Sequence, residues 1–130
     1  GLVNGTAYRV QVTASNEMGI GSASNPSAGL VPAGPPSAPR AVAVTARTSK
    51  QVALRWRAPA VLNGAPIVDY TVQWSTRKTA GFAVLRDPRS PVTTASFTRP
   101  RTGVTLYLRV IAVNGAGQSV ATAPIAVPAR

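Results

Sequence analysis

Short runs of alternating apolar and polar residues recur along this chain, separated by turns rich in glycine and proline. Residues 51–57 place Val52, Leu54 and Trp56 on one side of a strand and arginines on the other. Alternation at period two indicates a β-strand with one buried face. Runs of this kind, seven in all, occupy residues 42–44, 51–59, 66–75, 82–88, 93–98, 104–114 and 119–129. Seven short strands in about ninety residues predict a seven-stranded antiparallel β-sandwich.

The opening stretch, "GLVNGTAYRVQVTASNEMG", has the same alternation but no predicted strand before it to pair with. Its apolar side is formed by Tyr8, Val10, Val12 and Ala14, which alternate with polar residues. The dipeptide Asn-Gly before them supplies a turn. "NGT" is also formally a glycosylation acceptor, and the turn is the favoured interpretation.

An internal repeat explains this opening. Shifting the chain by 98 positions places Gly5 on Gly103, Val12 on Val110 and Asn16 on Asn114, with several further pairs in step. A repeat of this length predicts tandem sandwich domains. We therefore expect residues 1–31 to be the last two strands of a truncated copy, which should be mobile, pack on a neighbour or pair with another chain. Residues 32–38 would form a proline-rich linker, and residues 39–130 a complete domain.

The complete domain resembles a known family in several residues at once. Trp56, Pro59, the turn "NGAPI" with Ile67, and Tyr70 follow the spacing of the second and third strands of fibronectin type III domains. "AVNGAG" at 112–117 resembles the end of that family's sixth strand. The resemblance implies an immunoglobulin-like sandwich, with a core that includes Leu54, Trp56, Tyr70, Val72, Leu108 and Val110.

The family also has a tyrosine corner, in which a Tyr hydroxyl bonds back to the backbone before the sixth strand. "LVNGTAY" resembles this corner and implies that Tyr8 is its tyrosine. The equivalent position in the complete domain is Leu106, so we expect the corner hydrogen bond to be missing there.

The composition argues against an active site. The chain has no Cys and no His, and its three acids, Glu17, Asp69 and Asp87, are scattered. Disulfides, thiolate metal sites and the commonest general base are therefore excluded. We expect no catalytic residue, no metal site and no cofactor. No apolar run approaches the length that spans a membrane, and no membrane insertion is expected.

The net charge of +11 lies wholly within residues 39–130, since residues 1–38 hold one Arg and one Glu. Sandwich topology predicts that seven cations gather at the pole where the last strand exits: Arg47, Lys50, Arg77, Lys78, Arg99, Arg101 and Arg130. This basic pole is either a solvated surface or a site for an anionic partner, such as a cell-wall polymer, an acidic polysaccharide or non-specific nucleic acid. Interleaved exposed aromatic residues, which sequence-specific nucleic-acid recognition needs, are not evident.

A second candidate surface is the outward row of the sixth strand, formed by Tyr107, Arg109, Ile111 and Val113. Apolar residues on a solvent-facing side of a sheet indicate an interface, for which a neighbouring domain is the favoured occupant.

The resemblance implies a non-catalytic spacer, scaffold or protein-interaction module of a larger extracellular or cell-surface protein. The Ala- and Arg-rich composition without Cys is more similar to bacterial members. The alternatives are a dedicated binding module for an anionic polymer and a structural module of a phage tail or surface filament.

Overall fold

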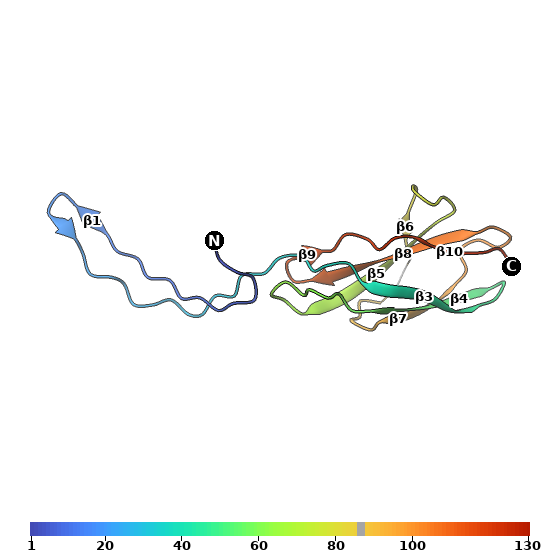
Figure 1. The fold of residues 1–130 in the computed structure, drawn as a ribbon, viewed down its shortest axis with the longest axis horizontal. Helices are drawn as coiled ribbons and strands as arrows, with labels where there is room; N and C mark the ends of the chain where they lie inside the picture. Colours follow the sequence, from blue (N-terminus) through green and yellow to red (C-terminus); the bar gives the residue numbers. More distant parts are fainter. Residues whose placement is uncertain (86–87) are drawn as a thin grey trace.

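The computed structural model describes residues 1–85 and 88–130, and within them the chain is all-β. It consists of a long two-stranded arm, residues 1–31, and a sandwich of two antiparallel sheets that lies at the base of the arm (Figure 1). Asp87, the third acid of the sequence, lies outside the described residues. The predicted all-β sandwich fold is confirmed.

The two sheets follow the predicted alternating runs. One sheet has the order β10-β8-β5-β6, with β9 pairing the far end of β8, and the other has the order β3-β4-β7. The first contains β5 (Ile67–Ser75), β6 (Ala83–Val84), β8 (Leu106–Asn114), β9 (Gly117–Gln118) and β10 (Ile125–Val127). The second contains β3 (Arg40–Arg47), β4 (Gln51–Arg57) and β7 (Thr94–Thr98).

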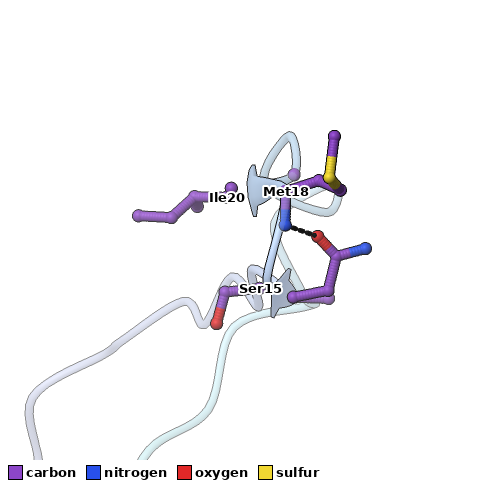
Figure 2. A pocket seen from close by; sticks show the side chains of 7 residues that line it. Ser15, Met18 and Ile20 are labelled. Carbon is purple, nitrogen blue, oxygen red and sulfur yellow. Dashed lines mark hydrogen bonds between the residues drawn. The ribbon is translucent and has the colours of Figure 1, made fainter.

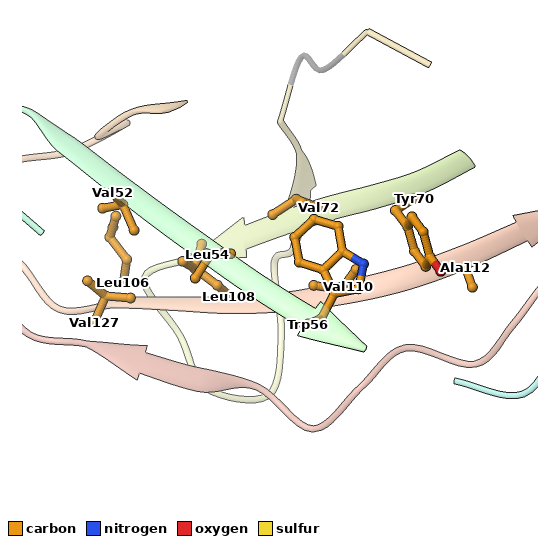
Figure 3. Close-up of a cluster of buried hydrophobic side chains, with 10 residues drawn as sticks. All are labelled: Val52, Leu54, Trp56, Tyr70, Val72, Leu106, Leu108, Val110, Ala112 and Val127. Carbon is orange, nitrogen blue, oxygen red and sulfur yellow. The ribbon is translucent and has the colours of Figure 1, made fainter. Parts of the chain in front are cut away.

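The core lies between the sheets, where every second residue of β4, β5 and β8 points inward (Figure 3). The rings of Trp56 and Tyr70 meet edge to face with centroids 5.4 Å apart. Burial raises the pKa of the Tyr70 hydroxyl above its usual value. All of the core residues expected from the sequence are buried, together with Val52, Leu106, Ala112 and Val127.

The arm consists of two paired segments. Only at its tip do these segments form regular strands, β1 (Ser15–Asn16) and β2 (Gly19–Ile20). Closer to the sandwich, Tyr8 and Leu30 exchange two backbone hydrogen bonds of 2.8 Å. With no second layer over it, the arm leaves its apolar side chains open, and Val12 is 69% exposed.

The hydrogen bonds of the arm recur in the sandwich 98 positions later. The N–H of Ser24 donates to the Val12 carbonyl at 2.8 Å, and the N–H of Thr122 donates to the Val110 carbonyl at 3.0 Å. The N–H groups of the two valines donate in turn to the hydroxyls of Ser24 and Thr122, both at 3.0 Å. The arm therefore has the local backbone pairing of the β8 hairpin, without the strands that cover that hairpin.

Candidate interaction surfaces

The base of the arm is held on the sandwich by two Asn-Gly turns that meet each other. The side-chain amide of Asn4 donates to the Asn63 side-chain oxygen at 2.9 Å, and the amide of Asn63 donates to the Pro35 carbonyl at 2.9 Å. The Asn63 backbone is in the left-handed region, with φ of 59°, which Asn tolerates better than most residues. Asn63 therefore links the arm, the proline-rich segment and the sandwich.

Gly64 lies where these three parts are closest. A Cβ on Gly64 would come within 2.5 Å of the Pro32 carbonyl oxygen and 2.7 Å of the Gly5 nitrogen. Its φ of +90° is a second reason for glycine at this position. Both backbones can approach only because this residue has no side chain.

Asn114, at the end of β8, completes this junction. It is buried, and its side-chain amide donates to the carbonyls of Gly34 at 2.8 Å and Leu62 at 3.0 Å. Its side-chain oxygen accepts from the N–H groups of Ala116 and Gly117. In the arm, the Asn16 side-chain oxygen accepts the corresponding bond from the Met18 N–H, but Asn16 is exposed.

The expected corner bond is present in the arm, where the Val3 N–H donates to the Tyr8 hydroxyl at 2.9 Å. In the sandwich, Leu106 at the equivalent position is fully buried. The adjoining turn, residues 99–105, is instead held by Arg99. Its guanidinium donates to the carbonyls of Arg101 at 2.9 Å and Val104 at 2.7 Å.

Arg99 corrects one expectation for the basic pole. It is only 4% exposed, and beyond its own turn it donates to the Pro128 carbonyl at 2.9 Å and contacts the Val127 carbonyl at 3.5 Å. The guanidinium ties the turn before β8 to the end of β10, so it is not available to a partner. Carbonyl oxygens that converge around one buried point explain why this cation turns inward.

The remaining cations of the basic pole are exposed: Arg47, Lys50, Arg77, Lys78, Arg101 and Arg130. The β3–β4 turn and the C-terminus lie at the end of the sandwich opposite the arm (Figure 1). Arg77 and Arg101, from different loops, line one shallow hollow with Trp74 and Ser75. The Lys50 carbonyl accepts from the Arg99 N–H at 2.7 Å, which places the β3–β4 turn beside the turn that carries Arg101.

The outward row of β8 is less open than the sequence indicates. Ile111 is buried, at 8% exposure, and Tyr107, Arg109 and Val113 are half-buried. The Arg109 guanidinium lies 4.0 Å from the centre of the Phe82 ring and donates to Gln73 on β5 at 2.7 Å. This face is therefore covered in part by its own side chains, and the expectation of an open apolar row is wrong at Ile111.

A hollow at the tip of the arm is formed by the β1–β2 turn (Figure 2). Its lining includes Met18, which is 93% exposed, and Ile20, also exposed. The one hydrogen bond drawn there joins the Asn16 side chain to the Met18 backbone. The residues that line the hollow include no charged side chain.

Across residues 1–85 and 88–130, no three carboxylate, imidazole or thiolate groups gather as a metal site would require. The same residues contain no helix long and apolar enough to cross a membrane.

Residues 37–128 match the family model described as "Fibronectin type III domain". Cardiac-type myosin-binding protein C from Gallus gallus is 30% identical over 118 residues, which are 91% of this chain and 9% of that protein. The fast-type protein from Mus musculus is 28% identical over 120 residues, with similar coverage. The chain thus spans about a tenth of the length of these relatives.

Solved structures give the same fold. The crystal structure of domains A168–A170 from titin matches with a TM-score of 0.74 at 24% identity, over 98% of this chain and 42% of that one. The twitchin kinase region from C. elegans matches with a TM-score of 0.62 at 27% identity, over 72% of this chain and 16% of that one.

These relatives correct the expected location. The resemblance implied an extracellular or cell-surface protein, whereas the relatives are named for binding myosin, a motor protein of the cell interior. The extracellular expectation is therefore wrong. The relatives come from animals and give no support to a bacterial type.

Proposed function

Because this chain belongs to the fibronectin type III family, we propose that it is a non-catalytic module that spaces and orients neighbouring units within a larger protein. The observation that carries the proposal is the repeated hairpin. Its hydrogen bonds recur at an offset of 98 positions, although its apolar face is open in the arm and closed in the sandwich. We infer that residues 1–31 are the sixth and seventh strands of a preceding sandwich.

The comparisons support a row of modules. The match to cardiac-type myosin-binding protein C covers 118 residues, more than residues 37–130 can supply, so it extends into the arm. The match to the titin fragment covers 98% of the chain, arm included. A two-stranded hairpin alone is marginal in water, which is a further reason to infer that other strands cover it.

A chimera tests this inference. Residues 37–98, joined directly before residue 1 of the intact chain, would supply the five missing strands, because residue 1 then takes the place of Arg99. We expect two cooperative unfolding units in place of one. Exchange of the Val12 and Ser24 amides with solvent should slow by a factor of about 100 or more, because their hairpin becomes part of a packed sandwich.

The control is the same chimera with Val12→Asp. A carboxylate in the new core should abolish the protection of the arm and leave the exchange of β8 in the original sandwich unchanged. If amide exchange in the arm is as fast in the chimera as in the 130-residue chain, residues 1–31 are not the closing strands of a sandwich of this type.

A second candidate function is binding of an anionic partner at the basic pole, and the hollow shared by Arg77 and Arg101 favours it. The segments 47–50, 76–81, 99–104 and 128–130 contain no acid. A concentration of one sign of charge raises the local potential and attracts the opposite charge. Arg99 contributes to this potential only from within the fold.

Charge reversal tests the basic pole. We expect Arg77→Glu with Arg101→Glu to lower the salt concentration that elutes the chain from heparin by much more than Arg55→Glu with Arg57→Glu. The second pair makes the same change in net charge on exposed residues of β4, a strand outside the basic pole. Equal shifts would mean that retention reflects net charge alone and that the basic pole is no site.

A further inference from the structure

The pole of the sandwich nearest the arm forms a built surface, and we propose that it is the docking site for the Asn-Gly turn of the preceding sandwich. This contact would hold successive modules in one fixed relative orientation. The docking pole consists of the Asn63–Gly64 turn, Asn114 and the Pro32–Pro35 segment. The proposal rests on the function proposed above, because it takes residues 1–31 as part of that preceding module.

The first argument is the closeness of the two backbones. Gly5 and Gly64 face each other so closely that a Cβ built on Gly64 would lie 2.7 Å from the Gly5 nitrogen. The Gly5 N–H also donates to the Pro32 carbonyl at 2.9 Å, which holds the Asn4–Gly5 turn on the segment that leads into the sandwich. A flexible connection does not need glycine at the point of contact, whereas close packing of two backbones does.

The second argument is the number of directed hydrogen bonds across the junction. Asn63 donates and accepts with its side chain, and its carbonyl accepts from the Gly34 N–H at 2.9 Å. Asn114 adds a bond to the Gly34 carbonyl, so both polar backbone groups of Gly34 are bound to the sandwich. The Ser37 N–H donates to the Val61 carbonyl at 2.9 Å. A proline-rich segment tied at successive points to one loop cannot act as a free hinge.

The third argument is a comparison of the docked turn with the equivalent turn of the sandwich. The turn that docks has a glycine in the left-handed region, with φ of +81° at Gly5. The equivalent turn of the sandwich, Thr102–Gly103, has the same conformation, with φ of +71° at Gly103, and nothing lies within 4 Å of a Cβ built there. One turn type therefore occurs in a docked and in a free setting, and the docking pole accounts for the difference.

Gly64→Ala in the 130-residue chain, followed by NMR with ¹⁵N labelling, tests the proposal. In the unaltered chain we expect a nuclear Overhauser contact between Gly5 and Gly64, and rigid backbone order parameters of about 0.85 at Gly5 and Gly34. In Gly64→Ala the contact should disappear and both order parameters should fall below about 0.6, because the new methyl group displaces the arm.

Gly103→Ala is the matched control, since it introduces the same methyl group at a similar positive φ where nothing is in contact. It should keep the contact and the order parameters. Asn63→Gly is a second variant, which permits the left-handed backbone but removes the side-chain bonds to Asn4 and Pro35. It should lower the order parameter of Gly5 without disturbing β8.

Flexible values at Gly5 and Gly34 in the unaltered chain would overturn the proposal, and so would equal behaviour of Gly64→Ala and Gly103→Ala. If the junction fails in this way while the chimera forms two sandwiches, the modular function stands without a fixed junction. If the junction holds while the chimera leaves the arm unprotected, the inference about the preceding module is the one that fails.

Discussion

Arg99→Met should lower the free energy of unfolding by roughly 2–4 kcal/mol, measured by urea denaturation. Methionine fills much of the same space but has no hydrogen-bond donor. The guanidinium donates to the carbonyls of Arg101, Val104 and Pro128, and these bonds would be lost. A hydrogen bond to a charged group contributes about 1.5–3 kcal/mol, and a buried acceptor left without a donor costs about as much as the bond was worth.

An opposing effect sets the size of this loss. Burying a guanidinium is costly, and one of its nitrogens, Nη1, is buried without a hydrogen-bond partner among residues 1–85 and 88–130. Removing Arg99 relieves that cost, which is why the expected loss is smaller than the sum of its bonds. We expect the loss to dominate because these three carbonyl groups lie in part-buried positions and lose their donor in the variant, whereas replacing all partners of a buried polar cluster together can be neutral.

Arg101→Met is the control for this substitution. Arg101 lies on the same turn and its side chain is exposed, while the bond to Arg99 uses only its backbone carbonyl. Its loss should change the free energy of unfolding by no more than about 0.5 kcal/mol. A variant Arg99→Met as stable as Arg101→Met would show that burial of the guanidinium costs as much as its hydrogen bonds contribute.

The strands and the core of the sandwich were predictable because period-two alternation assigns each side chain to a face. Val52, Leu54 and Trp56 of β4 are buried as their alternation requires, and Arg55 and Arg57 on the opposite face are exposed. Tyr70 could be placed in the core together with Trp56 from the family spacing, whereas the contact between their rings could not. Burial of alternate residues is a local property of a strand, so it can be recognised without knowledge of what the strand packs against.

The position of Arg99 could not be predicted in the same way. An arginine in a loop is exposed unless several acceptors converge on it, and here the acceptors come from its own turn and from the end of β10. The substitution of Leu106 for the corner tyrosine was the available signal. It indicated that the usual bond was missing, but not which residue would hold the turn.

The junction was also beyond sequence reasoning. Asn4–Gly5 and Asn63–Gly64 each predict a turn, because both residue types tolerate positive φ. Nothing in a turn signal states what the turn contacts, and these two lie 59 positions apart. The proline-rich segment indicated an extended linker, and its bonds to Asn63 and Asn114 are visible only in three dimensions.

The repeat offers a second large and controlled test, because identical residues occupy the same place in two environments. Val110 of the sandwich is fully buried, and Val12 of the arm, 98 positions earlier, is 69% exposed. Their backbones make the same pair of hydrogen bonds, so the two sites differ mainly in what covers the side chain.

We expect Val110→Ala to lower the free energy of unfolding by about 2–3 kcal/mol, since two buried methyl groups are lost and a cavity remains. Val12→Ala should change it by less than about 0.5 kcal/mol, because its methyl groups already contact water. Thermal and urea denaturation of both variants at several protein concentrations would measure the difference.

The concentration series decides what a larger effect at Val12 would mean. If Val12→Ala costs as much as Val110→Ala and the cost grows with protein concentration, the open face of the arm is covered by a second copy of the chain. If the cost is large and independent of concentration, the arm folds back on its own sandwich in solution and its apolar face is covered there. A small cost at Val12 beside a large one at Val110 leaves the arm as an open hairpin, which only further strands can close.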